Sequence, residues 1–385
     1  MADLKNVMGI SADDIKSIMG VSKDDIKSVM GFEIPSTGWY GDRGLAAGYH
    51  RYGRSSGVWY TNNIQYRSIS GSSHCAKFGE FATIGSDANV SVWRTSAVSG
   101  GWRGMFQGGD IAIDSGSSFP FEDKMWYVTI ASTGDASVGT DMPSFSYTHY
   151  TITGHYFNNQ GGGSNGTTGI IVSDGYGQSF YNTISSTSAA SVGGTLTSIQ
   201  NNQGGGGGNL YMFQMLTKAD GTDAIEYMAY ATPGNNAAVW GDLTAYGQLR
   251  TSCSSDTRTV TWGFYGSDNI SPQTNGMEYW DHASTGNAAA FGNLVGVYCS
   301  TTDSTVGKFS GMAMSNGTRG ERWAGWAITG DNQPNGSDCN YIGNMNVDYI
   351  TIGSTGNAAD SGYNLADLDS TGVSYTDHYG VGISG

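Results

Sequence analysis

Short runs of alternating apolar and polar residues, separated by Gly, Ser, Thr and Asn, recur along most of the chain. In residues 259–265, Val260, Trp262 and Phe264 fall on one face of a predicted strand and the threonines on the other. Apolar runs at residues 209–216 and 322–329 predict further strands. This pattern is typical of an all-β fold built from many short strands.

A tyrosine-centred motif repeats six times and indicates the number of structural units. Each copy is a strand-like core around Tyr, followed by small residues, Gly and an apolar residue; the six tyrosines are Tyr66, Tyr127, Tyr181, Tyr227, Tyr279 and Tyr349. They are 61, 54, 46, 52 and 70 residues apart. Four-stranded propeller blades require periods in this range. We therefore predict a six-bladed β-propeller over residues 36–385.

The end of the chain carries a sign of ring closure. Residues 374–379 (Ser-Tyr-Thr-Asp-His-Tyr) echo residues 146–150 (Ser-Tyr-Thr-His-Tyr), which open the third repeat. We therefore expect a C-terminal strand to complete the first blade, which would remove an exposed sheet edge. The glycine tracts at residues 161–163 and 204–208 are expected to be loops between strands.

Residues 1–35 carry a different repeat of 11 residues. Val-Met-Gly recurs at residues 7–9, 18–20 and 29–31, and Asp-Ile-Lys-Ser at 14–17 and 25–28. With Ser as N-cap and Gly at the C-terminal end, each unit predicts a short α-helix, and the chain as a whole a small helical N-terminal extension. Helices this short are marginal alone, so we expect residues 1–31 to bind other copies or other proteins. The expected assembly residues are Val7, Met8, Ile15, Ile18, Met19, Ile26, Val29 and Met30. The alternative is a small helical cap folded onto the propeller itself.

Charge and composition exclude several classes of function. The net charge of −15 and the lack of clustered Lys or Arg argue against nucleic-acid binding. No stretch approaches the ~20 apolar residues of a membrane helix, and the first residues lack the pattern of a signal peptide. We expect a location in a virion or outside the cell.

A search for catalytic and metal-binding motifs predicts neither an enzyme nor a cofactor. The six histidines form no HExxH or His-x-His pattern, and no Gly-x-Ser-x-Gly elbow occurs. The four cysteines are scattered, which favours buried thiols over metal ligands and leaves one disulfide as the alternative. Residues 315–323 only approach a sialidase Asp-box, and no carboxylate pair for glycoside hydrolysis stands out. A polysaccharide-degrading enzyme stays the least favoured alternative.

Ligand binding by the propeller is a stronger alternative than catalysis. Aromatic rings beside amides suit sugar rings, and a lectin-like propeller that binds a host-surface glycan is the second hypothesis. The candidate ligand-facing aromatic residues are Trp39, Tyr40, Trp59, Tyr60 and Trp280.

The two repeats together resemble those of virion proteins of tailed phages, marine ones in particular. The Val-Met-Gly and Asp-Asp-Ile-Lys-Ser units are similar to short repeats near the start of such proteins. The pattern Asp-Tyr-Ile followed by Ser-Thr-Gly-Asn-Ala-Ala, at residues 348–359, resembles kelch-like propeller repeats of the same sources. Repeats one to three depart from it, with Ser73 in place of the Gly. The resemblance implies a virion structural protein, such as a tail fibre, appendage or surface fibre, with its N-terminal segment anchored and its propeller facing outward.

Overall fold

The computed structural model describes most of the strands of the propeller and part of the N-terminal region. The described residues are 41–47, 62–81, 95–113, 121–143, 162–173, 177–197, 202–217, 222–244, 250–264, 274–295, 311–323, 346–365 and 381–385, together with the backbone of shorter strand segments named below. In this part of the chain every regular element is a β-strand.

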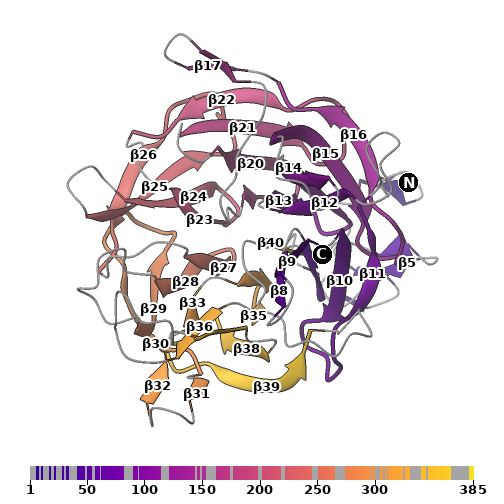
Figure 1. Ribbon diagram of the computed structural model, residues 1–385. Helices are drawn as coiled ribbons and strands as arrows, with labels where there is room; N and C mark the ends of the chain where they lie inside the picture. Colours follow the sequence, from indigo (N-terminus) through magenta and orange to yellow (C-terminus); the bar gives the residue numbers. More distant parts are fainter. Residues whose placement is uncertain are drawn as a thin grey trace.

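Six antiparallel sheets stand around a common centre (Figure 1) and form the blades of a propeller. From the centre outward, blade 1 contains β40 (Val381–Ser384), β7 (Arg43–Ala47), β10 (Asn63–Ser68) and β11 (Ala76–Glu80). Blade 2 contains β13 (Ser96–Ser99) and β12 (Val90–Trp93), which both pair with β14 (Arg103–Ile113), then β15 (Phe121–Thr129) and β16 (Ser137–Asp141). Blade 3 contains β19 (Gly163–Ser164), β20 (Thr168–Val172), β21 (Gln178–Thr183) and β22 (Ser191–Thr195).

The second half of the ring repeats the same order. Blade 4 contains β23 (Asn202–Gly207), β24 (Tyr211–Thr217), β25 (Asp223–Ala229) and β26 (Ala238–Asp242). Blade 5 contains β27 (Thr251–Ser254), β28 (Arg258–Phe264), β29 (Thr274–Asp281) and β30 (Ala289–Asn293). Blade 6 contains β34 (Met312–Ser315), β35 (Arg319–Trp323), β38 (Asn346–Thr351) and β39 (Ala359–Asn364). The prediction of an all-β, six-bladed propeller is confirmed, and each of the six motif tyrosines lies in the third strand of its blade.

The C-terminal strand closes the ring, as predicted. Strand β40 pairs antiparallel with β7, so that Ile383 lies opposite Leu45 and Ser384 opposite Gly44. The first blade is therefore built from both ends of the propeller sequence. The echo at residues 374–379 that prompted the prediction lies outside the described residues, and the closing strand begins only at Val381.

The hydrophobic core consists of six clusters, one between each pair of neighbouring blades. Between blades 1 and 2, for example, Phe78 and Phe81 of the first blade pack with Phe106 and Trp126 of the second. Equivalent clusters fill the five other junctions. Because each blade buries both of its faces in this way, apolar side chains of a single strand serve two different clusters.

A recurring turn joins four of the blades to the outer strand of the preceding blade. In the turn between third and fourth strands, which reads Ser-Thr-Gly-Asx-Ala in blades 2, 5 and 6 and Pro-Gly-Asn-Asn-Ala in blade 4, an Asx side chain accepts a hydrogen bond from a backbone N–H of that outer strand. We call this contact the turn latch. It joins Asp135 to Glu80 (2.9 Å), Asn236 to Thr195 (3.1 Å), Asn287 to Asp242 (3.0 Å) and Asn357 to Asn293 (3.0 Å).

The described residues of the N-terminal extension lie in strands, so the predicted helices are not supported there. Three hairpins pair β1 (Asn6–Val7) with β2 (Ile10–Ser11), β3 (Ser17–Ile18) with β4 (Val21–Ser22), and β5 (Ser28–Val29) with β6 (Phe32–Glu33). The sequence between the paired strands is Met-Gly each time, and Gly suits a two-residue hairpin connection as well as a helix end. Of the predicted assembly residues, Val7, Ile18 and Val29 are therefore strand residues. Met8, Ile15, Met19, Ile26 and Met30 lie outside the described residues.

The prediction that the glycine tracts are loops is also wrong. Gly163 belongs to β19, and Gly204 to Gly207 belong to β23, so these glycines form innermost strands rather than loops. The reason is crowding at the axis. A Cβ atom on Gly206 would lie 2.7 Å from the Ser254 hydroxyl oxygen, and one on Gly204 would lie 2.5 Å from the Arg250 carbonyl oxygen.

Further hairpins are inserted between or within blades. They are β8 (His50–Gly53) with β9 (Gly57–Tyr60), β17 (Phe145–Tyr147) with β18 (Tyr150–Ile152), and β31 (Val297–Cys299) with β32 (Ser304–Val306). A three-stranded sheet of β33 (Lys308–Phe309), β36 (Trp326–Thr329) and β37 (Asn340–Gly343) lies within the blade 6 sequence. No helix in the described part of the chain is long and apolar enough to cross a membrane.

Candidate functional site: the axial channel

The innermost strands of all six blades enclose a small cavity at the propeller axis, with a volume of about 70 Å³. Its walls are the short segments that end in Ser99, Ser164, Gly207, Ser254, Ser315 and Ser384. Five of the six blades thus place a serine at the same position, and the fourth blade places a glycine there. In sequence, each of these residues except Ser384 stands four positions before the first residue of the next strand.

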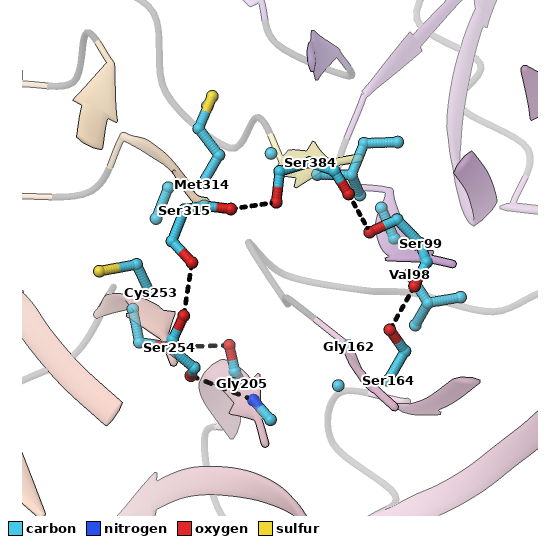
Figure 2. A pocket seen from close by; sticks show the side chains of 18 of the residues that line it. Val98, Ser99, Gly162, Ser164, Gly205, Cys253, Ser254, Met314, Ser315 and Ser384 are labelled. Atoms are coloured by element: carbon cyan, nitrogen blue, oxygen red, sulfur yellow. Dashed lines mark hydrogen bonds between the residues drawn. The ribbon is translucent and has the colours of Figure 1, made fainter. Parts of the chain in front are cut away.

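The serine hydroxyls form a directional series of hydrogen bonds around the axis (Figure 2). Ser164 donates to the carbonyl oxygen of Ser99, and Ser99 donates to that of Ser384 at 2.7 Å. Ser384 in turn donates to the carbonyl oxygen of Ser315, and Ser315 to that of Ser254. Each hydroxyl therefore links its inner strand to the next one in the same rotational sense. We call this series the serine ring.

The serine ring is interrupted at blade 4. A Cβ atom on Gly207 would lie 2.2 Å from the hydroxyl oxygen of Tyr230, so a serine does not fit there. The backbone N–H of Gly207 instead donates to the Ser254 hydroxyl at 3.2 Å. Tyr230 is itself an exception, because the same position after the third strand holds Ile69, Ile130, Ile184 and Ile352 in four other blades.

In blade 5 the residue after the third strand is His282 instead of isoleucine. His282 lies at the end of a chain of hydrogen bonds that leads from the axis. The Nδ1 atom of His282 lies 3.1 Å from the carbonyl oxygen of Asp256, which can only accept, so Nδ1 carries the proton of the neutral ring. The Nε2 atom then accepts from the Thr259 hydroxyl at 2.9 Å, and Thr259 accepts from Ser254 at 2.9 Å. Burial lowers the pKa of His282 to about 4, against an ordinary value of 6.5.

The arrangement of Ser254, Thr259 and His282 differs from a nucleophile and base pair. Nucleophilic catalysis requires the base in direct hydrogen-bond contact with the attacking oxygen. Here Thr259 stands between the two groups, and His282 is stacked on Phe213 with ring centroids 4.6 Å apart. The chain of hydrogen bonds thus satisfies buried polar groups where blades 4 and 5 meet.

Buried charges in the same region are also paired across blades. The Arg250 guanidinium, which precedes β27, contacts Glu278 of β29 at 3.0 Å and Asp223 of β25 at 3.2 Å. Glu278 also accepts from the backbone N–H of Thr244 at 2.9 Å. Arg250 therefore joins blades 4 and 5 through their carboxylates, and these acids are part of the scaffold.

Of the aromatic residues proposed from the sequence, only Trp280 has a described side chain. Trp280 is 3% exposed and packs against Phe213 in the cluster between blades 4 and 5, so it belongs to the core and not to a ligand-facing surface. Trp39 and Tyr40 lie outside the described residues. Trp59 and Tyr60 end β9, and their side chains are likewise outside the description. Within the described residues no group of three or more His, Cys, Asp or Glu is arranged to hold a metal ion.

Two of the four cysteines have described side chains, and both are buried free thiols. These are Cys75 and Cys253. Burial raises the pKa of Cys75 to about 12 and raises that of Cys253 as well. Sequence reasoning missed the serine ring, although the spacing of Ser99, Ser254 and Ser315 from the Arg that begins the next strand is a signal that could have found it.

Comparisons with known proteins give no family for this chain. No protein-family model matches the chain, and no curated protein matches it. Among solved structures, the chain is similar to one titled "Crystal structure of Nidogen/Laminin Complex", with 8% sequence identity and a TM-score of 0.48. The similarity covers 88% of this chain and 98% of that chain. At this identity it says nothing about function.

Proposed function

We propose that this protein is a non-catalytic structural component of an extracellular assembly, with the propeller as a rigid body and residues 1–33 as its attachment segment. The observation that carries the proposal is the separation of the two parts. The three N-terminal hairpins pair only within themselves, and none of their strands joins a blade. The resemblance of both repeats to phage virion proteins favours a tail fibre, appendage or surface fibre as the assembly.

The need for a partner follows from the size of the hairpins. An isolated two-stranded hairpin is marginally stable at best in water. Each strand here has two residues, and each unit places an apolar pair, such as Val7 opposite Ile10, beside the connection. Three such units in series are therefore expected to gain order by packing against other copies or against another protein of the assembly.

The ring has the properties expected of a rigid body. Its ends are paired in blade 1, four of its junctions are tied by Asx turn latches, and the serine ring links inner strands around its axis. A cavity of about 70 Å³ at the axis is far smaller than the ~300–1,000 Å³ of typical ligand pockets. These features support a mechanical role for the ring over chemistry at its axis.

The proposal is tested by comparing the full chain with a variant lacking residues 1–33, using light scattering and electron microscopy. The full chain is expected to self-associate, and the shortened chain to be a monomeric ring with an unchanged melting temperature. Two matched triple variants of the full chain are compared. One replaces Val7, Ile18 and Val29 with Asp, and the other replaces Lys5, Lys16 and Lys27 with Asp. Only the first triple variant should lose assembly. A shortened chain that assembles as the full chain does would remove the attachment role.

A further inference from the structure

A groove of about 830 Å³ lies on the flank of blade 2, away from the axis. One wall is the outer strand β16, from Ser137 to Thr140, and the others are the turns that follow the third strands of blades 2 and 3. The loop between β13 and β14 adds Trp102, and the first residue of β14 adds Arg103. Figure 1 shows β14, β15 and β16 as neighbouring strands running to the outer rim.

Trp102 is an exception among six equivalent positions. Its carbonyl oxygen accepts a hydrogen bond from the backbone N–H of Ile130. In the other blades the carbonyl oxygens that accept the equivalent bond belong to Asp42, Thr167, Leu210, Thr257 and Thr318. Blade 2 alone has an aromatic residue at this position. The Trp102 side chain is 39% exposed, whereas the other tryptophans with described side chains are buried. Because the fold is built without an aromatic ring in five blades, the architecture does not require Trp102.

Arg103 and Tyr127 form the floor of the groove beside Trp102. The guanidinium carbon of Arg103 lies 4.1 Å from the centre of the Tyr127 ring and 5.7 Å from that of Trp102. Its Nη1 atom donates to the carbonyl oxygen of Ser185 at 3.0 Å, which fixes the guanidinium against blade 3. The ring of Tyr127 packs against Gly139 on β16, where a Cβ atom would lie 1.9 Å from the tyrosine ring. The groove therefore has an ordered base before any ligand arrives.

The groove lies at one of the two junctions that have no Asx latch. In blade 3 the Asx position of the turn is Ala189, so no side chain there reaches the outer strand of blade 2 as in the turn latch. The contact in its place is a hydrogen bond from the Thr140 hydroxyl to the Thr187 carbonyl at 3.0 Å. Hydroxyl side chains of both turns and of β16 consequently line the groove together with the Asp135 carboxylate.

We propose that this groove binds a saccharide, with Trp102 as the stacking platform. The exposed indole offers an apolar face for the C–H side of a sugar ring, and it carries a polar N–H at its edge. The Asp135 carboxylate and the Ser and Thr hydroxyls supply acceptors and donors for sugar hydroxyls. A phosphate ligand is disfavoured, because the groove contains one arginine and one aspartate and the chain has a net charge of −15. The site does not depend on the proposed attachment role.

The test uses the full chain on an array of neutral and uronate-containing oligosaccharides, followed by calorimetric titration with the strongest-binding array glycan. The wild-type chain is expected to bind a subset of glycans, and Trp102→Thr to bind them about tenfold more weakly or not at all. Three other blades have Thr at this position, so this variant is expected to keep its melting temperature. Trp102→Phe retains a stacking face and should recover part of the affinity.

Leu210→Thr is the matched control. Leu210 occupies the same position in blade 4 and is 67% exposed, so its replacement removes an exposed apolar side chain outside the groove. Glycan binding by this variant should equal that of the wild type. The saccharide site is overturned if the wild-type chain binds no array glycan, or if Trp102→Thr binds as tightly as Leu210→Thr.

Discussion

The Nδ1 atom of His74 accepts a hydrogen bond from the backbone N–H of Asn364 at 3.1 Å. His74 belongs to the first blade and Asn364 to the last, so this bond crosses the junction where the ring closes. It occupies the place that Asp135, Asn236, Asn287 and Asn357 take elsewhere. The backbone N–H of Cys75 adds a bond to the Asn364 carbonyl at 3.1 Å. An imidazole thus serves as the turn latch at the junction between the two ends of the propeller sequence.

Replacing His74 should reveal how much this latch contributes. His74→Ala removes one acceptor and is expected to lower the free energy of unfolding by about 1 kcal/mol. His74→Asn introduces the side chain used at three other junctions and should recover most of that loss. Urea denaturation of both variants measures the difference, with Asn357→Ala as a comparison at an ordinary junction. Equal stabilities of the Ala and Asn variants would contradict a latch role for His74.

The closing strand should be essential for stability. Ile383 is buried between blades 1 and 2 opposite Leu45, and its replacement by Ala is expected to cost about 2–5 kcal/mol. Deletion of residues 372–385 removes that side chain and the whole β40–β7 pairing, so the melting temperature should fall further. Differential scanning calorimetry checks both variants. An unchanged melting temperature after the deletion would mean that blade 1 is stable without its inner strand.

The buried charge cluster should respond far more strongly than a surface ion pair. Arg250→Ala leaves the buried carboxylates of Asp223 and Glu278 without their cation, and a loss of about 3–5 kcal/mol is expected. Lys77→Ala removes an exposed pair with Glu80 and should cost less than about 1 kcal/mol. Equilibrium denaturation of the two variants tests the contrast. Similar losses in both would show that Arg250 does not hold the two blades together.

The buried imidazole predicts a loss of stability in mild acid. The pKa of His282 is about 4 in the folded chain and about 6.5 when unfolded, so the unfolded state binds more protons between these values. Its contribution to stability is therefore complete above pH 6.5 and decreases as the pH falls toward 4. His282→Ile introduces the residue of four other blades and should remove this part of the pH dependence. Melting temperatures of both proteins between pH 7 and 4.5 check it, and parallel curves would rule out His282 as the cause.

The buried thiols should be inert while the chain is folded. Burial holds the pKa of Cys75 near 12, so almost none of it is thiolate at pH 8. Alkylation by iodoacetamide, followed by peptide mass spectrometry, is expected to label Cys75 and Cys253 only after denaturant is added. Rapid labelling of either thiol in buffer would show that its blade junction opens readily.

The number of blades was predictable because a tyrosine at the same position makes the same contact in most blades. Tyr66, Tyr127, Tyr279 and Tyr349 each lie beneath an arginine of the second strand, with distances from 3.7 to 4.9 Å between guanidinium carbon and ring centre. A repeated contact of this kind leaves a repeated sequence. The latch turns were visible as a pattern for the same reason, although their bonds to the preceding blade were not.

Features that depend on distant strands could not be predicted. Gly204 to Gly207 have the composition of a loop, and only the approach of blades 3 and 5 explains why they form a strand. Trp280 has the character of a binding residue, and only the packing of Phe213 against it shows that it is core. The exposure of Trp102 likewise follows from the arrangement of blades 2 and 3 around it and is not visible in the sequence.

The serine ring also limits how many blades the propeller can hold. Each link spans the distance from one inner strand to the next with a single hydroxymethyl group, the shortest polar side chain available. Four of the six neighbouring pairs of inner strands are therefore held at the separation that one serine side chain spans, and this separation sets the inner circumference. In a seven-bladed ring the inner strands would lie too far apart for a serine side chain to link them. In a five-bladed ring the inner strands would be forced into steric contact. The length of a serine side chain is thus matched to a ring of six blades.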